Sequence, residues 1–113
     1  MALSMGEGKH TDHAALEQLF AAIEDGDSKK VKAALETGNV DVNYRNSQGE
    51  TLLHAAARYG NKNLIKGLLR RHADPTMTNP SGQTAYDVAE ASEFPELGAY
   101  IRRKAGIADS DPE

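Results

Sequence analysis

The sequence predicts an all-α solenoid, in which antiparallel helix pairs stack on one another and short β-hairpin-like fingers join them. Three observations support this fold. Apolar residues recur at helical spacing in short segments, glycines interrupt these segments, and the whole pattern repeats after 33 or 34 residues. A helix pair this small cannot bury its apolar face alone, so neighbouring repeats must cover it.

The middle repeat, residues 49–74, shows the pattern most completely. Thr51 is a good N-cap for a first helix over residues 51–58, since its hydroxyl oxygen can accept a hydrogen bond from an unpaired backbone N–H. Gly60 ends this helix, because glycine tolerates the left-handed backbone angles of a helix stop. A second helix follows, and its apolar face consists of Leu64, Ile65, Leu68 and Leu69.

The same pattern recurs on both sides of the middle repeat. Adding 33 to the residue number carries Gly49 to Gly82, and subtracting 34 carries Gly60 to Gly26. A period near 33 with this internal pattern resembles the ankyrin repeat, over about residues 14–106. Leu52 stands where that family has proline, and the third repeat reads T-A-Y-D where the family reads T-P-L-H. The matching residues are Gly49, Thr51, Leu53, His54, Ala56, Ala57, Gly60, Leu68, Leu69, Ala73 and Asp74, with Asp41, Val42 and Asn43 ending the preceding repeat.

The first repeat has no finger before it. We expect its first helix over residues 13–24, with Thr11 or Asp12 as the N-cap and Gly26 as the stop. The second helix begins at Asp27 or Ser28 and ends at Gly38. A finger then spans residues 41–50, with turn-forming residues at 46–49.

The third repeat begins after a second finger, residues 74–83, whose turn residues lie at 79–82. Thr84 and Asp87 have the spacing of a capping box. Pro95 suits the first turn of the last helix, where no N–H is needed, and Gly106 suits its end. Glu93 stands where the middle repeat has Gly60, which predicts a different kind of linker between these two helices.

The second helices differ in their apolar rows. Lys30 aligns with Leu64 and Arg102 aligns with Leu69, so each outer repeat loses one apolar row, and the two lost rows are opposite. Each terminal repeat of a solenoid needs one apolar face that packs on its neighbour and one polar face that is exposed to solvent. We therefore expect a closed three-repeat domain over residues 12–106 (about 12–45, 46–78 and 79–106), monomeric, with Lys30 and Arg102 facing solvent. Residues 1–11 are expected to be a disordered lead and residues 107–113 an acidic disordered tail.

The composition limits the function. The net charge of −4 is mild and argues against a dedicated nucleic-acid binder. There is no cysteine, and no apolar run approaches the roughly 18 residues of a membrane span. We expect a cytoplasmic protein without a membrane segment, with the nucleus as the alternative location.

Motifs of catalysis and cofactor binding are missing. The sequence has no Gly-rich phosphate loop, no H-E-x-x-H and no G-x-S-x-G. His10 and His13 have the spacing of metal ligands on a helix, but no third ligand lies nearby in the sequence. The resemblance implies that His54 is structural, because the equivalent histidine of the family bonds to the backbone of a neighbouring turn. We therefore expect no catalytic residue, no cofactor and no metal site.

The resemblance implies a protein–protein interaction module, an adaptor or scaffold that binds through finger tips and the concave helix face. Arg and Tyr are frequent interface anchors, which favours Arg58 and Tyr59 as the centre of the surface. The predicted protein-binding residues are Arg45, Ser47, Gln48, Glu50, Arg58, Tyr59, Thr78, Pro80, Ser81 and Gln83.

Two alternatives remain open. The first is a regulatory domain or fragment of a larger protein or enzyme. The second is weak nucleic-acid binding by a basic strip of Arg70, Arg71, Arg103 and Lys104. The structural explanation of this strip is that cations are favourable at the C-terminal ends of helices, where the helix dipole is negative. Residues 1–50 hold 5 basic and 9 acidic side chains, a net of −4, and the remainder sums to zero. This uneven charge favours a polarised protein partner over a phosphate backbone.

Overall fold

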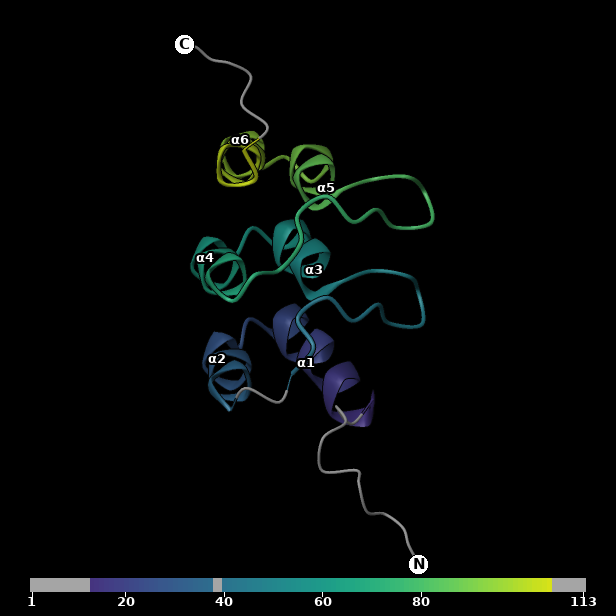
Figure 1. Cartoon of the computed structure of the whole chain (residues 1–113), viewed down its shortest axis with the longest axis vertical. Coiled ribbons are helices and arrows are strands. Elements are labelled where there is room, and N and C mark those ends of the chain that lie inside the picture. The colour runs from purple at the N-terminus through teal and green to yellow at the C-terminus, as the bar shows by residue number, and fades with distance from the viewer. Residues whose placement is uncertain (1–12, 38–39, 107–113) are drawn as a thin grey trace, which may run out of the picture.

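The computed structural model describes residues 13–37 and 40–106, which form three stacked helix pairs (Figure 1). No β-strand is present in these residues, and the predicted all-α solenoid is confirmed. The predicted lead, the acidic tail, the Thr11 or Asp12 cap and the stop at Gly38 lie outside the described residues. The helices are α1 (His13–Asp25), α2 (Ser28–Glu36), α3 (Leu52–Arg58), α4 (Lys62–Arg70), α5 (Ala85–Ala91) and α6 (Pro95–Lys104).

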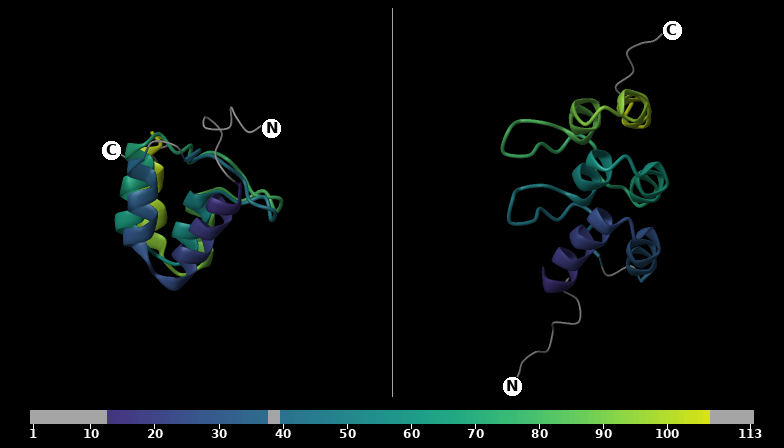
Figure 2. Two further views of the ribbon diagram at one scale, coloured as in Figure 1. Left: turned by 90° about the horizontal axis from the view of Figure 1, so that it is seen from below. Right: turned by 180° about the vertical axis from the view of Figure 1, so that it is seen from behind.

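The helices form two layers. Seen along the stack, α1, α3 and α5 lie over one another, and α2, α4 and α6 form the outer layer, while both fingers project from the inner layer (Figure 2). Helix α3 packs against α1 and α5, and α4 packs against α2 and α6. The middle repeat is therefore covered on both sides, as its two apolar rows predict.

Small side chains hold the layers close together. Ala55, Ala56 and Ala57 of α3 are buried, and their size lets the neighbouring helices approach closely. Leu64 and Leu68 of α4 are completely buried. Burial of such aliphatic side chains supplies most of the stability of a domain without tryptophan, at about 25 cal/mol per Å² of apolar surface.

The helix starts follow the predicted capping chemistry. Thr51 and Thr84 each accept a backbone N–H bond at the third position of α3 and α5, and His54 and Asp87 complete the two capping boxes. Asp27 caps α2 through the backbone N–H of Lys30 at 3.1 Å. Pro95 is at the start of α6, as predicted.

The linker at Glu93 corrects one prediction. Glu93 has a φ of +72°, close to the +69° of Gly60. The backbone N–H of Phe94 donates to the Ala89 carbonyl at 2.8 Å, as Asn61 donates to Ala56 in the middle repeat. The prediction of a different linker was therefore wrong: packing of the helix pair imposes one turn conformation on both linkers, despite the unfavourable left-handed angles for glutamate.

The two residues expected to face solvent at the ends of the stack differ in exposure. Lys30 is exposed, as predicted. Arg102 is only half-exposed, with its guanidinium 5.0 Å from the centre of the Tyr86 ring and 3.3 Å from a Glu90 carboxylate oxygen. A fully solvent-facing Arg102 was therefore a wrong expectation, because its long side chain folds back over α5 and covers apolar surface there.

Candidate protein-binding surface

Each finger tip is a tight turn that begins at an asparagine, Asn46 or Asn79, whose side chain closes it. The backbone N–H of Asn46 donates to the Glu50 carbonyl at 2.9 Å, and the Asn46 side-chain oxygen accepts from the backbone N–H groups of Gln48 and Glu50. Asn79 makes the equivalent bonds in the second finger. The turns predicted at residues 46–49 and 79–82 are therefore present. No β-strand lies in either finger, residues 41–50 and 74–83.

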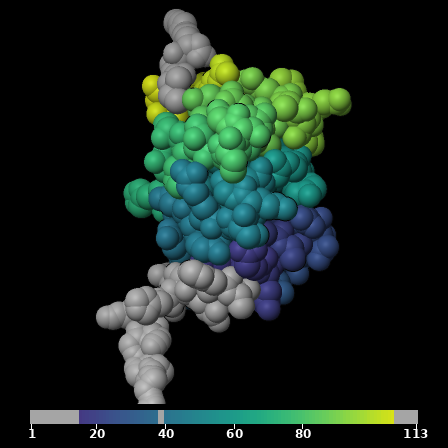
Figure 3. Space-filling view, turned by 90° about the vertical axis from the view of Figure 1, so that its right-hand side faces the viewer, coloured from purple at the N-terminus to yellow at the C-terminus, as the bar shows by residue number. Residues whose placement is uncertain are grey.

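The two fingers are fastened to each other. An Nη of Arg45 donates to the backbone carbonyl of Thr78 at 2.7 Å, and the Asn79 side-chain amide donates to a Glu50 carboxylate oxygen at 3.3 Å. Seen from the finger side, the fingers pack directly on one another (Figure 3). Their exposed tips therefore form one continuous surface with a fixed relative position.

His54 fixes the base of the second finger. It is buried, its Nδ1 accepts from the Thr51 backbone N–H at 3.2 Å, and its Nε2 lies 2.9 Å from the Gln83 carbonyl oxygen. A backbone N–H only donates and a carbonyl only accepts, so the ring is neutral with its proton on Nε2. Burial lowers the pKa of His54 below its ordinary value. The structural role implied by the family resemblance agrees with these contacts.

Glu50 and Arg58 form a two-bond ion pair at the inner end of the first finger. The guanidinium nitrogens of Arg58 donate to the two Glu50 carboxylate oxygens at 2.6 and 2.5 Å, and Glu50 is only 9% exposed. The hydrogen bond from Arg58 lowers the pKa of Glu50, and the same bond raises that of Arg58. The guanidinium of Arg58 therefore pairs with a carboxylate of the same chain. Arg58 thus has a structural role, besides any contact with a partner.

The predicted binding residues divide by exposure, and their binding role stays a prediction. Glu50 is buried, and Arg58 and Gln83 are half-buried. The Gln83 side-chain oxygen accepts from the Asn79 amide at 3.2 Å. The exposed members are Arg45, Ser47, Gln48, Tyr59, Thr78, Pro80 and Ser81.

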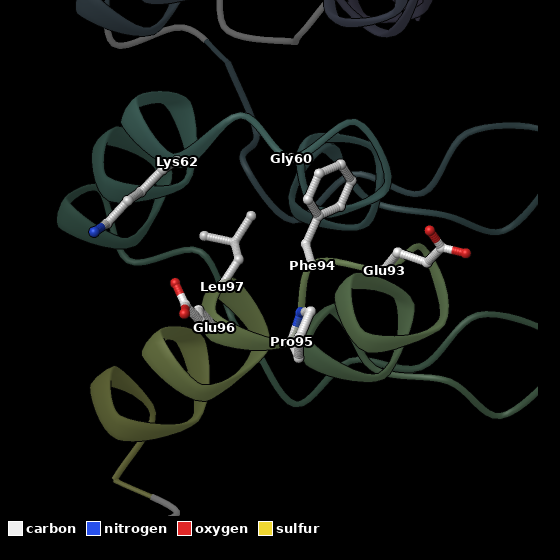
Figure 4. A pocket seen from close by; sticks show the side chains of 7 residues that line it. All are labelled: Gly60, Lys62, Glu93, Phe94, Pro95, Glu96 and Leu97. Atoms are coloured by element: carbon white, nitrogen blue, oxygen red, sulfur yellow. The ribbon is translucent and has the colours of Figure 1, made fainter.

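Two aromatic side chains are exposed at the turns between paired helices. Tyr59 is 47% and Phe94 is 37% exposed, and these are the exposed large hydrophobic residues of the described chain. The Phe94 ring lies on Gly60, where an added Cβ would be 2.6 Å from the ring (Figure 4). An open hollow of about 400 Å³ lies beside it, lined by Gly60, Lys62, Glu93, Phe94, Pro95, Glu96 and Leu97.

Sequence reasoning missed Phe94. A signal was available, because Phe94 occupies the N-cap position of α6, where α2 has Asp27 and α4 has Asn61. Phe94 makes no capping hydrogen bond with its side chain. An aromatic residue at a position that favours short polar side chains indicates another task, here contact with the turn of the preceding repeat.

Within residues 13–37 and 40–106, no group of three histidine or acidic side chains is placed to hold a metal ion. None of the described helices has both the length and the apolar character needed to cross a membrane. The side chains of His10 and His13 are outside what the structure describes.

Comparison with known proteins identifies the repeats. Residues 35–89 match the family described as "Ankyrin repeats (many copies)". The chain is 41% identical over 98 residues to the BTB/POZ domain and ankyrin repeat-containing protein NOOT2 of Medicago truncatula, covering 84% of this chain and 20% of that protein. It is 39% identical over 98 residues to the regulatory protein NPR6 of Arabidopsis thaliana, covering 84% of this chain and 21% of the relative.

A third relative extends the similarity over more of the chain. The BTB/POZ domain and ankyrin repeat-containing protein NPR5 of Oryza sativa subsp. japonica is 36% identical over 111 residues, which is 96% of this chain and 21% of that protein. The chain therefore spans about a fifth of the length of the curated relatives it matches. The helix pairs, the fingers, the capping threonines and these matches agree, and the chain belongs to the ankyrin repeat family.

Proposed function

We propose that the chain is a non-catalytic adaptor that binds a protein partner through its two finger tips and the inner-helix surface that ends at Tyr59. The observation that carries this proposal is that hydrogen bonds join the two fingers to each other. Bonds from Arg45 and Asn79 join the two fingers, and His54 ties the second finger to α3, while most of the tip side chains remain exposed. A preformed surface loses little conformational freedom on binding, which favours affinity.

Tyr59 is the anchor that we favour at this surface. It is the most exposed large hydrophobic residue described, and tyrosine combines apolar area with a hydroxyl that can bond across an interface. The tips contribute small polar groups, Ser47, Gln48 and Ser81, which suit hydrogen bonds at the rim of an interface. We propose binding as a monomer, in the cytoplasm or the nucleus.

A second candidate is the same surface acting as the recognition segment of a longer regulatory protein. Relatives that the chain matches over about a fifth of their length carry BTB/POZ domains by name, or are named regulatory proteins. In that case the partner would be selected here and the consequence would arise in another domain.

Affinity capture with matched variants tests the proposal. Gln48→Ala with Tyr59→Ala removes an exposed tip side chain and the anchor, and neither residue has a buried polar partner to leave unpaired. Lys29→Ala with Lys32→Ala removes two exposed side chains from α2 and is the control. Partners captured by the wild type should be lost with the first pair and kept with the second, while circular dichroism shows both variants folded. Equal capture by all three chains would overturn the proposal.

A further inference from the structure

The ends of α4 and α6 enclose an open groove that is distinct from the finger tips and from Tyr59. Its volume is about 900 Å³. Lys66, Leu69 and Arg70 of α4 line one side, and Tyr100 and Lys104 of α6 line the other. Two neighbouring repeats thus bring cations and apolar side chains into one hollow.

The cations of this groove have no acidic partner. Among residues 13–37 and 40–106 the ion pairs are Glu50–Arg58 and Glu90–Arg102, and neither includes a cation of the groove. Asp74 is the acidic residue in the lining. Its carboxylate accepts two hydrogen bonds from Thr76, at 2.9 and 2.6 Å, and these bonds lower the pKa of Asp74. The groove therefore keeps an excess of positive charge.

Helix dipoles explain only part of this arrangement. Arg70 and Lys104 lie in the last turns of α4 and α6, where cations are favourable. Lys66 lies one turn earlier on α4, beyond the range in which the dipole acts strongly. The dipole of α4 therefore does not explain why Lys66 lies at the groove.

The ring of Tyr100, which lines the groove, attracts two lysines: Lys104, which also lines the groove, and Lys62 of α4, which does not. The ammonium nitrogens of Lys62 and Lys104 lie 5.3 and 5.7 Å from the centre of this ring. Attraction to the ring holds each lysine close to Tyr100, although like charges near one ring repel each other. An anion bound here would relieve that repulsion.

We infer that this groove binds an acidic polypeptide segment with at least two carboxylates on either side of an apolar side chain. The carboxylates pair with Lys66 and Arg70 on one side and with Lys104 on the other, and the apolar side chain rests on Leu69 and Tyr100. A polypeptide fits better than a nucleic acid, because the groove offers only the rings of Tyr100 and His72 for stacking and the whole chain is acidic, with a net charge of −4.

The strip predicted from the sequence is divided by the structure. Arg70 and Lys104 line the groove, whereas Arg71 and Arg103 do not. This division supplies a matched control. Lys66→Glu with Lys104→Glu reverses two charges inside the groove, and Arg71→Glu with Arg103→Glu reverses two exposed charges at the ends of the same helices.

The test is fluorescence anisotropy with a fluorescein-labelled peptide that has glutamates on both sides of one central phenylalanine. The glutamine counterpart of this peptide and a single-stranded oligoribonucleotide are titrated in parallel. We expect saturable binding of the glutamate peptide, weakened about tenfold or more by reversal inside the groove and less than about threefold by the control pair. The glutamine peptide should bind at least about tenfold more weakly.

Three results would overturn the inference. Equal losses with the two charge-reversed pairs would indicate attraction to the general charge of the chain. Equal affinity for the glutamine and glutamate peptides would show that the groove does not recognise carboxylates. Tighter binding of the oligoribonucleotide, with a steep loss of affinity as salt rises, would assign the groove to a phosphate backbone. Because this groove does not include Tyr59 or the finger tips, its failure leaves the proposed adaptor surface standing.

Discussion

The Nε2 of His54 lies 2.9 Å from the carbonyl oxygen of Gln83, 29 positions later in the chain. This bond joins the first helix of the middle repeat to the end of the next finger. Because the backbone N–H of Thr51 donates to Nδ1 of the same ring, only the neutral ring satisfies both partners. The position of the second finger therefore depends on a ring that must stay neutral to keep both bonds.

The first prediction concerns the pH dependence of folding. Burial lowers the pKa of His54 in the folded state, so between that pKa and the ordinary value of about 6.5 the unfolded chain binds more protons. His54 therefore destabilises the fold increasingly as the pH falls below about 6.5 and has no such effect well above it. Urea denaturation at several pH values should show a smaller loss of stability in His54→Gln than in the wild type.

A matched variant separates this effect from the other histidines. His72 is exposed, so His72→Gln should keep the wild-type loss of stability between about pH 7.5 and 5.5. Glu50 acts in a different window: its pKa is lowered, so the stability that it contributes is lost only as the pH falls below about 4.5. An identical pH profile for the wild type and His54→Gln above pH 5 or so would contradict the assigned role.

The second prediction concerns the contact between the finger tips. Gly49 and Gly82 both have a φ near +78°, so alanine at either position should cost roughly 1–2 kcal/mol. A Cβ on Gly49 would lie 2.6 Å from Pro80 Cγ, whereas one on Gly82 would meet open space. Gly49→Ala should therefore lower the free energy of unfolding by about 1 kcal/mol more than Gly82→Ala. Removing the ring, in Gly49→Ala with Pro80→Ala, should recover that difference.

The third prediction concerns the left-handed linker. Glu93→Gly removes the unfavourable φ of +72° and should raise the free energy of unfolding by up to about 1 kcal/mol, after the entropic cost of glycine in the unfolded chain. Glu96→Gly makes the same chemical change in the first turn of α6 and should destabilise by about 0.5–1 kcal/mol. Thermal unfolding of the two variants should move in opposite directions, and shifts of the same sign would refute the linker assignment.

The fourth prediction compares the middle of the stack with its end. Leu68 is fully buried in α4, so Leu68→Ala should cost about 2–5 kcal/mol, a large share of the stability of a small domain. Lys30 is exposed on α2, and Lys30→Leu should change the free energy of unfolding by less than about 0.5 kcal/mol. Chemical denaturation measures both values. A cost for Lys30→Leu as large as that for Leu68→Ala would mean that this end of the stack is covered.

The repeat architecture could be predicted from the sequence because each signal is local and recurs. Thr51 and Thr84 precede helical segments at one spacing, and Gly49 and Gly82 end one kind of turn. Where the signal for an element is weak in one repeat, the equivalent positions of the other repeats still identify that element. One exception was Glu93, where the packing of two helices overrides the conformational preference of a single residue.

The candidate sites were harder to predict, because their chemistry depends on distances between repeats. Arg58 and Tyr59 are adjacent in the sequence, yet Arg58 pairs with the buried Glu50 while Tyr59 is exposed. Nothing in the local pattern of either residue indicates this difference. The contact of Lys62 on α4 with the ring of Tyr100 on α6 likewise follows from the stacking of these two helices.

The most direct test of the proposed adaptor surface is site-specific photo-cross-linking. Benzoylphenylalanine replaces Gln48 at a finger tip or Tyr59 at the C-terminal end of α3, and replaces Ala33, exposed on α2, as the control. The measurement is the yield of cross-linked partner at each position in a lysate of the source cell, determined by mass spectrometry. The proposal predicts a common partner cross-linked at positions 48 and 59 and little product at 33. A partner cross-linked at 33 but at neither 48 nor 59 would contradict it.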